Sequence, residues 1–455
     1  MPLPSQNFER RTPMPVSPEE LYAWHEREGA LQRLLPPFDN AQVVETSGSF
    51  ADRRVVMRIN VLGPVWQTLI ARHRLAVPGV RFQDGQEQGP FARWEHTHEF
   101  LPAPGGSELL DRIEYALPLG VLGQTFGGAF ARARIERMFQ FRHQRTREDL
   151  ARHTGFPMKS LRVAVTGASG LIGTQLCSFL TTGGHTVDRL VRRDAGPGEI
   201  KWDPARRTLD ARALEGVDVV VHLAGENVGG GRWTVARKSE VMKSRVDGTH
   251  TIATAVASLD KKPLLISASA VGYYGNTGDS VADETTPNGT GFLAEVCKAW
   301  EASADPARAA GVRVVHPRLG VVLSGAGGAL AQMKAPFLLG VGGPIGDGRQ
   351  WFPWIAMDDA VGALHHLMAA GLEGPVNLVA PASVRQAEFA KVLGKVLGRP
   401  AILPLPAFAV RALFGEMGQG ILLDGQRVAA RRLLESGYRF VREDLEAALR
   451  FELGR

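Results

Sequence analysis

Leu161-Arg-Val-Ala-Val-Thr-Gly-Ala-Ser-Gly-Leu-Ile-Gly173 is an apolar run that breaks into three glycines and then resumes with helical spacing. Its aliphatic start is typical of a strand buried on both faces of a parallel sheet. Gly167 can make the tight turn, Gly170 leaves room for a pyrophosphate, and Gly173 lets the helix Leu171–Thr182 pack closely on the strand. Glycine-rich strand ends also occur as plain turns. Here the resumed helical spacing favours a dinucleotide site, in which the ligand's negative charge meets the helix N-terminus.

The second expected strand, His185–Arg192, leads into a pair of arginines, Arg192 and Arg193. A site that prefers NAD commonly has an Asp or Glu at this position to bind the free ribose hydroxyls. Arginine instead suits the 2′-phosphate of NADP(H), because its planar fork matches phosphate geometry. The alternative is that both arginines only solvate a loop. The pair therefore favours NADP(H) as the cofactor.

Residues 217–225 predict another buried strand, this one closed by small residues that let the backbone lie against a cofactor. Together with the glycine-rich loop and the arginine pair, it completes a set of predicted cofactor-binding residues. They are Gly167, Ser169, Gly170, Leu171, Ile172, Gly173, Arg192, Arg193, Leu223, Ala224 and Gly225.

Residues 263–275 predict a strand that ends in hydroxyl-bearing side chains, among them Ser269, Tyr273 and Tyr274. Open α/β sheets bind ligands at the carboxyl ends of their strands, so we expect chemistry there. Further strands are expected at Val312–Leu323 and Gly374–Ala380, with helices between them. The alternation predicts an α/β fold with a Rossmann-type, doubly wound parallel sheet.

The first 157 residues have a different pattern. Ser17 and Pro18 predict a helix start, and alternating segments at residues 42–50, 54–61, 91–101 and 108–117 predict an antiparallel sheet. Phe126–Leu150 predicts a long amphipathic helix over that sheet. His96 and His98 share one strand face, but the sequence shows no third ligand beside them. We therefore expect no metal site.

This order of helix, curved sheet and long helix resembles the START-like (SRPBCC) ligand-binding superfamily over roughly residues 5–150. The resemblance rests on Phe91-Ala-Arg-Trp-Glu-His-Thr-His-Glu-Phe100, Asp111-Arg-Ile-Glu-Tyr-Ala-Leu-Pro-Leu-Gly120 and Arg137-Met-Phe-Gln-Phe-Arg-His143. It implies an α+β helix-grip domain whose sheet encloses an apolar cavity for a lipid or other apolar ligand.

Residues 160–455 resemble the extended short-chain dehydrogenase/reductase superfamily, and within it the proteins called the epimerase family. The motifs are Thr166-Gly-Ala-Ser-Gly-Leu-Ile-Gly173, His222-Leu-Ala-Gly-Glu-Asn227, Ser244-Arg-Val-Asp-Gly-Thr249, Ser267-Ala-Ser-Ala-Val-Gly-Tyr-Tyr-Gly275, Pro317-Arg-Leu-Gly-Val-Val-Leu323 and Trp351-Phe-Pro-Trp-Ile355. The resemblance divides the chain into a START-like domain at residues 1–157, a Rossmann-type domain at 158–402 and a small C-terminal helical module at 403–455.

One position departs from the superfamily. There, a tyrosine four residues before a lysine donates the proton, and the lysine binds the nicotinamide ribose. Lys298 matches the lysine by its place in the motif, but Ala294 stands where the tyrosine is expected. The resemblance therefore implies Ser269, Tyr274 and Lys298 as catalytic candidates, with Lys298 also touching the cofactor. Tyr273 is an alternative acid, and both tyrosines could instead line the substrate cavity.

The composition and the charge pattern exclude several classes of binding partner. The chain has 455 residues, a dispersed net charge of +6 and two cysteines, Cys177 and Cys297, which exclude a disulfide framework. No charge pattern indicates nucleic-acid binding, and no apolar run indicates a signal peptide or a membrane span. We expect a cytoplasmic protein with a small-molecule substrate, and the oligomeric state, homo-oligomer included, stays open.

Three functions follow from these patterns. The leading one is an NADP(H)-dependent oxidoreductase or epimerase acting on an unidentified apolar or nucleotide-sugar substrate. The alternative is a non-catalytic, NADP(H)-responsive protein that binds lipid or another hydrophobic ligand. In the third, the N-terminal region serves only dimerisation or assembly.

Overall fold

The computed structural model describes residues 5–63, 65–158 and 160–455, which form two compact units. The first unit runs to Phe156 and includes two short later segments, Thr181–Gly183 and Glu452–Gly454. The second begins at Pro157 and holds the remainder. Each unit has its own sheet, so each is described by itself.

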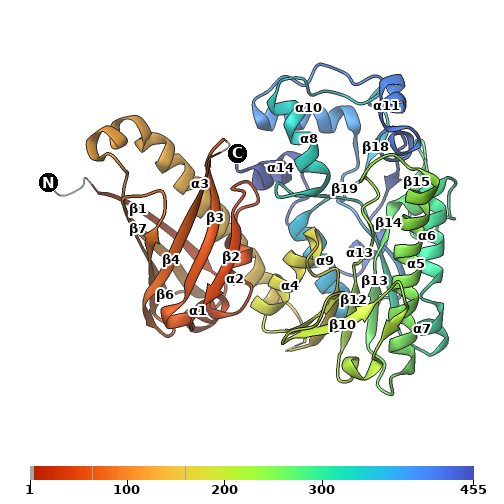
Figure 1. The fold of residues 1–455 in the computed structure, drawn as a ribbon, viewed down its shortest axis with the longest axis horizontal. Coiled ribbons are helices and arrows are strands. Elements are labelled where there is room, and N and C mark those ends of the chain that lie inside the picture. Colours follow the sequence, from red (N-terminus) through yellow and green to blue (C-terminus); the bar gives the residue numbers. More distant parts are fainter. Residues whose placement is uncertain (1–4, 64, 159) are drawn as a thin grey trace. The chain divides into compact units, whose positions relative to one another are not determined.

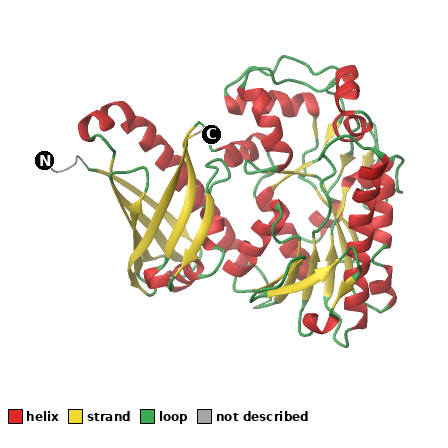
Figure 2. Cartoon of the chain, viewed as in Figure 1, coloured by secondary structure: helices red, strands yellow, loops and turns green. Residues whose placement is uncertain are grey.

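The first unit is a seven-stranded antiparallel sheet with strand order β1-β7-β6-β5-β4-β3-β2 (Figure 1). Its strands are β1 (Gln6–Met14), β2 (Gln42–Ser47), β3 (Arg54–Leu62), β4 (Val65–Val77), β5 (Arg81–Gln88), β6 (Arg93–Ala103) and β7 (Gly106–Ala116). Its helices are α1 (Pro18–Glu26), α2 (Ala30–Leu34), the 3₁₀ turn η1 (Phe50–Asp52) and α3 (Gly120–Thr154). The long helix α3 lies along the sheet in Figure 2, and the helix-grip prediction is confirmed.

Local chemistry explains where these elements begin. Ser17 accepts a hydrogen bond from the Glu20 amide and caps α1, as its sequence predicts. The aromatic ring of Phe139 on α3 packs with Phe8 and Tyr115 of the sheet, which buries the inner sheet face. The alternation did not reveal β4, because most of its side chains are exposed or half-exposed and no apolar face repeats along it.

The second unit is built on a parallel sheet with the order β10-β9-β8-β12-β13-β16-β20. These strands are β8 (Arg162–Thr166), β9 (Thr186–Val191), β10 (Glu199–Asp203), β12 (Val219–His222), β13 (Leu264–Ser267), β16 (Val314–Leu319) and β20 (Gly374–Leu378). The first strand lies in the middle and the order reverses beside it, which is the doubly wound Rossmann arrangement. The predicted fold class is therefore confirmed.

Helices cover both sides of this sheet. Figure 1 shows α4 and α9 on one side and α5, α6 and α7 on the other. The helices of the unit are α4 (Leu171–Thr182), α5 (Val235–Ser258), α6 (Phe292–Ala302), α7 (Asp305–Ala309), α8 (Gly328–Leu338), α9 (Met357–Ala369), α10 (Gln386–Leu397), α11 (Ala407–Phe414), α12 (Glu416–Gly418), α13 (Arg431–Glu435) and α14 (Leu445–Leu453).

Shorter elements complete the unit. They are β11 (Thr208–Leu209), β14 (Ser269–Ala270), β15 (Val281–Ala282), β17 (Val321–Leu323), β18 (Trp351–Phe352), β19 (Trp354–Ala356), β21 (Val384–Arg385), β22 (Arg427–Val428), the 3₁₀ turns η2 (Ala211–Leu214) and η3 (Val271–Tyr274), and the π-helical turn η4 (Gln419–Leu423). Strand β22 pairs with β15 in a separate two-stranded sheet, which ties the C-terminal segment to the segment that precedes α6.

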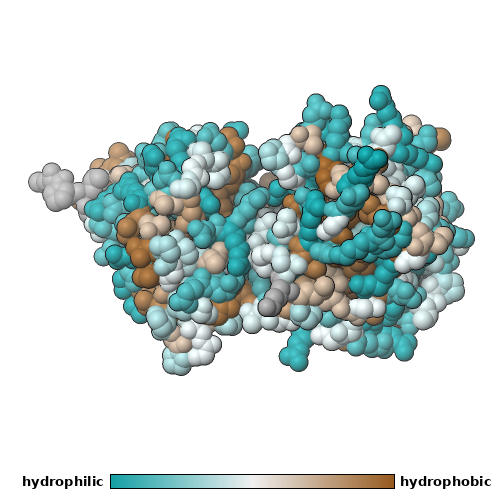
Figure 3. Space-filling view, turned by 90° about the horizontal axis from the view of Figure 1, so that it is seen from below, coloured by the Kyte–Doolittle hydropathy of each residue, from teal (hydrophilic) through white to brown (hydrophobic). Residues whose placement is uncertain are grey.

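The surface is mixed in character. On the face shown in Figure 3, hydrophilic and hydrophobic residues are interspersed in small groups. None of the helices among the described residues combines the length and apolarity needed to cross a bilayer.

Candidate active site

The carboxyl ends of three neighbouring strands lie in one row. Thr166 of β8 pairs in register with His222 of β12, which in turn pairs with Ser267 of β13. The Thr166 hydroxyl also accepts hydrogen bonds from the amides of Leu223 and Ala224, at 3.1 and 3.2 Å. The glycine-rich loop and the end of β12 are thereby tied together, which places both predicted cofactor segments at one edge.

The glycines of the loop lie where side chains would not fit. Gly167 has a φ of +67°, and a Cβ on Gly173 would lie 2.1 Å from the Gly167 carbonyl oxygen. Ser169 and Gly170 are exposed at the tip of the loop, and Leu171 and Ile172 begin α4. The amides at this helix end are available to a pyrophosphate, so the residues present fit a dinucleotide.

The two arginines after β9 have different surroundings. Arg193 pairs with Glu199, with Nη1 and Nη2 at 2.7 and 2.5 Å from its carboxylate oxygens. Arg192 is exposed, and no other residue in the described part of the chain forms a hydrogen bond or ion pair with its side chain. Arg192 is therefore the arginine that is free to meet a phosphate. The role of both arginines stays a prediction.

A charged cluster stands beside the end of β13. The Arg318 guanidinium grips Glu301 with two parallel hydrogen bonds, from Nε at 2.8 Å and from Nη2 at 2.9 Å. Ser269 Oγ lies 2.7 Å from Glu301 Oε1. Burial opposes ionisation of Glu301, but Arg318 outweighs it and holds the Glu301 pKa below its usual value. Because an ionised carboxylate only accepts, Ser269 donates its proton to Glu301.

Tyr274 belongs to the same cluster. Its hydroxyl accepts from Arg318 Nη1 at 2.9 Å and donates to Asn377 Oδ1 at 2.7 Å. Burial raises the pKa of Tyr274 to about 12, and the bonds from Arg318 and Asn377 offset only part of that rise. Tyr274 is thus protonated at neutral pH, but its proton points at Asn377.

Tyr273 differs from its neighbour. Its ring lies under the Arg318 guanidinium, with the ring centroid 3.4 Å from Cζ. The side chain is half-exposed, and among the described residues nothing forms a hydrogen bond with its hydroxyl. Of the two tyrosines, Tyr273 is the one with a free phenol.

Helix α6 carries the position of the missing tyrosine. Ala294 is fully buried, whereas Lys298, one turn later, is exposed. Glu301 lies at the end of the same helix and Trp300 packs beneath Arg245, 4.8 Å from its Cζ. The structure thus brings Ser269 and Tyr274 together through Glu301 and Arg318, while Lys298 stands outside that cluster.

The sequence prediction missed Glu301, Arg318 and Asn377. Arg318 belongs to the family motif Pro317–Leu323 quoted above, and Glu301 follows Lys298 on the same predicted helix. Both positions were visible in the sequence, but their contact was not. The bidentate pair joins α6 to β16, and only the packing of helix on sheet brings those residues within reach.

The first unit contains a separate apolar cavity of about 460 Å³. Its lining is mostly aliphatic and aromatic, and it spans the inner sheet face and α3, including Met57, Phe82, Trp94 and Met138. Asp84, His96 and His98 also line it, and these three side chains could hold a metal ion. A third potential ligand, which the sequence did not reveal, therefore stands beside the two histidines.

Three known families match separate segments of the chain. Residues 163–379 match the NAD dependent epimerase/dehydratase family, and residues 405–452 match a domain of unknown function. Residues 14–140 match the polyketide cyclase/dehydrase and lipid transport family.

Relatives extend the match. The epimerase family protein Mb2239 of Mycobacterium bovis is 45% identical over 294 residues, 64% of this chain and 97% of that protein. The solved nucleoside-diphosphate sugar epimerase from Corynebacterium glutamicum is 34% identical with a TM-score of 0.81, covering 98% of this chain and 90% of that one. The human epimerase family protein SDR39U1, solved with NADPH, is 39% identical with a TM-score of 0.59, covering 64% of this chain and 99% of that one. The glycine-rich loop, the strand order and the relatives all indicate the same family. This chain belongs to the epimerase family of short-chain dehydrogenase/reductase proteins and has a START-like domain at its N-terminal end.

Proposed function

We propose that the second unit is an NADP(H)-dependent oxidoreductase or epimerase whose substrate presents a hydroxyl group to Ser269. The observation that carries the proposal is the joint placement of a phosphate cradle and the Ser269–Glu301–Arg318 cluster at the carboxyl edge of one sheet. The human relative solved with NADPH supports the choice of cofactor.

The residues present fit this cofactor. We assign the pyrophosphate to the loop of Gly167 and Gly170 with the N-terminus of α4, the 2′-phosphate to Arg192 and the ribose to Lys298. Leu223, Ala224 and Gly225 form the adjoining backbone wall, where a Cβ on Gly225 would lie 3.3 Å from Arg245. Bound NADP(H) supplies a hydride donor or acceptor.

The substrate side follows from the hydrogen bonding of Ser269. Since its single proton goes to Glu301, the serine oxygen offers acceptor lone pairs to the site. An alcohol can donate to that oxygen directly, whereas a carbonyl would have to break the bond to Glu301. We therefore propose that Ser269 orients a substrate hydroxyl, and that the bidentate Arg318 grip fixes Glu301 for this purpose.

We propose Tyr273 as the proton donor in place of the residue missing at Ala294. Its hydroxyl is free, while the hydroxyl of Tyr274 is held between Arg318 and Asn377. Tyr274 then acts as a positioning residue for Arg318. A general acid must reach the substrate atom that it protonates, and only the free phenol meets that condition without first losing a partner.

Turnover assays test the function. Nucleotide sugars come first in the substrate panel, because the Corynebacterium relative bears that description, and apolar alcohols and ketones follow. The full chain should change NADPH absorbance with one class or interconvert nucleotide-sugar epimers. Ser269→Ala should abolish that turnover and retain NADPH binding. Tight NADPH binding without turnover across the panel would instead favour the non-catalytic alternative.

A second function is supported by the cavity of the first unit. About 460 Å³ of mostly apolar space matches the size range of small-molecule sites. We propose that the START-like domain binds an apolar ligand there. Mass spectrometry of organic extracts of the purified protein should find such a ligand, and Met57→Trp, which fills the cavity, should reduce the amount recovered.

A further inference from the structure

Two carboxylates and two imidazoles meet on the inner face of the first unit's sheet. Asp84 of β5 is the direct cross-strand neighbour of His96 on β6, and Asp111 of β7 is that of His98. All four side chains therefore project to the same face. The ring nitrogens of each histidine point at Asp84 on one side and at Asp111 on the other, so both imidazoles stand between two carboxylates.

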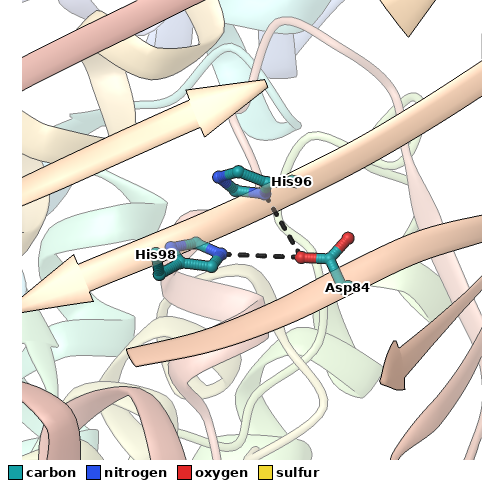
Figure 4. A group of neighbouring side chains, drawn as sticks. All are labelled: Asp84, His96 and His98. Atoms are coloured by element: carbon teal, nitrogen blue, oxygen red, sulfur yellow. Dashed lines mark ion pairs between the residues drawn. The ribbon is translucent and has the colours of Figure 1, made fainter. Parts of the chain in front are cut away.

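On the Asp84 side, one distance is at the long end of the hydrogen-bond range and the other lies beyond it. Asp84 Oδ2 lies 3.2 Å from His96 Nδ1 and 3.6 Å from His98 Nε2 (Figure 4). Charge-assisted hydrogen bonds between nitrogen and oxygen are about 2.7–2.9 Å long. Ligand atoms at about 2.1 Å around a tetrahedral ion are about 3.4 Å apart. The observed distances bracket that separation, and the three candidate ligand atoms lie within 4.8 Å of one another.

The Asp111 side supplies the support that metal-binding histidines use. Asp111 Oδ1 lies 2.7 Å from His98 Nδ1 and 3.4 Å from His96 Nε2, on the nitrogens that face away from Asp84. Asp111 Oδ2 is bound by His143 Nε2 at 2.8 Å, and His143 Nδ1 contacts Thr12 Oγ1 at 2.9 Å. A carboxylate in this position can orient a metal-binding imidazole and raise the basicity of its ligand nitrogen once the ring turns its N–H onto the oxygen.

On the Asp111 side, three polar atoms of this cluster lack a well-aligned hydrogen bond. His96 Nε2, His98 Nδ1 and Asp111 Oδ1 are buried without a well-aligned hydrogen bond, although the histidines are only 2% and 7% exposed. Asp111 is buried and Asp84 is half-buried, and burial makes carboxylate charge costly unless it is compensated. A dication matches their combined charge with both histidines neutral.

We propose that Asp84, His96 and His98 bind a divalent first-row transition-metal ion, of which Zn²⁺ fits the tetrahedral spacing best. Asp84 Oδ2, His96 Nδ1 and His98 Nε2 are the ligands, and Asp111 orients both imidazoles. Because the three ligands line the apolar cavity, the remaining coordination position faces that space. The proposal concerns the first unit and is independent of the function proposed for the second.

Zn²⁺ binding to the tag-free full chain, stripped with a chelator, tests this site. Calorimetric titration and elemental analysis should give one ion per chain. Asp84→Asn, which preserves shape, and His98→Ala should each lower the affinity at least about tenfold, and Asp111→Asn about ten- to hundredfold. His73→Ala is the matched control, because this cavity histidine contacts the Phe50 carbonyl oxygen at 2.6 Å and lies outside the ligand set.

Co²⁺ gives a readout that does not depend on the variants. The wild-type protein loaded with Co²⁺ should show the intense visible absorption of a four-coordinate ion, and circular dichroism should show that Asp84→Asn remains folded. Absence of stoichiometric Zn²⁺ binding and of the Co²⁺ spectrum would overturn the proposal, as would equal affinity in wild type, Asp84→Asn and His98→Ala. The cluster would then be a polar network held by protons.

Discussion

Arg318 donates a hydrogen bond to the Tyr274 hydroxyl at 2.9 Å, and the same guanidinium covers the ring of Tyr273 without bonding to its hydroxyl. Adjacent tyrosines therefore have separate tasks in the proposed site. One holds a cation in place, and the other keeps a free phenol.

Replacing each tyrosine by phenylalanine separates these tasks. Tyr273→Phe should reduce turnover about 10²- to 10⁴-fold, because it removes the proposed general acid, and it should leave the melting temperature nearly unchanged. Tyr274→Phe should lower the free energy of unfolding by about 1–3 kcal/mol, since it leaves a buried Arg318 donor without its acceptor. NADPH titration provides the control for both. A full loss of turnover in Tyr274→Phe, with Tyr273→Phe active, would restore Tyr274 as the acid.

The Glu301–Arg318 pair predicts a pH-dependent stability. The folded-state pKa of Glu301 lies below its ordinary value of 4.5, so the pair stabilises the fold above pH 4.5 and loses this contribution as pH falls through the folded pKa. At neutral pH, Glu301→Gln should lower the free energy of unfolding by about 3–5 kcal/mol, because it leaves Arg318 buried without its counter-ion.

Denaturant titrations at several pH values measure this effect. The difference in stability between wild type and Glu301→Gln should be constant from pH 7 to about pH 5 and should shrink below pH 4.5. A difference that stays constant down to pH 3 would mean that the contact with Arg318 does not lower the folded-state pKa of Glu301.

The arginine pair predicts a cofactor preference. Arg192→Ala should weaken NADPH binding about ten- to hundredfold, because a charge-assisted contact worth about 1.5–3 kcal/mol is lost, and should leave NADH binding unchanged. Arg193→Ala is the matched control, since Glu199 already occupies its guanidinium. Fluorescence titration of each variant with NADPH and with NADH gives four affinities, which are compared with those of the wild type. Equal effects of the two substitutions would refute the assignment to Arg192.

The phosphate loop predicts a steric effect. A Cβ at position 173 would meet the Gly167 carbonyl oxygen at 2.1 Å, so Gly173→Ala should displace the loop and abolish NADPH binding. Gly229→Ala is the control, because its added Cβ would meet only Asn227 Oδ1, at an ordinary 3.6 Å. Retention of wild-type affinity in Gly173→Ala would mean that the loop does not hold the pyrophosphate.

The predicted division at residues 157 and 402 can be tested by fragments. Residues 1–157 should fold alone and bind an apolar dye, because the first unit has its own sheet and cores. Residues 403–455 should not fold alone, since the backbone pairing of β22 with β15 lies across that boundary. Circular dichroism of both fragments and of residues 158–455 measures whether each of them is folded. A folded 403–455 fragment would make it a domain in its own right.

The parts predicted from sequence are those that local patterns encode. The buried aliphatic runs and the loop of Gly167, Gly170 and Gly173 predicted the Rossmann sheet, and Ser17 predicted the start of α1. These features depend on residues a few positions apart, where backbone geometry and periodicity are sufficient.

The missed parts depend on contacts between distant segments. Glu301 and Arg318 meet only when α6 packs beside β16, and Asp84 meets His96 only through the pairing of β5 with β6. Asp84 also lies in a stretch where exposed, polar positions conceal the strand, so neither its element nor its partner was visible.

The register of β5 has a consequence for sequence length. Its ladder with β4 contains two irregularities, between Ile70 and Ala71 and between His73 and Leu75, whereas its ladder with β6 is regular from Arg81 to Gly85. The extra residue is Glu87 of β5 at the first irregularity and Arg74 of β4 at the second, so β4 already contains one bulge and can absorb an inserted or deleted residue as another. A single insertion between His96 and His98 would turn one imidazole to the outer face. Length variation among natural and engineered versions of this domain should therefore concentrate in β4 and spare β6.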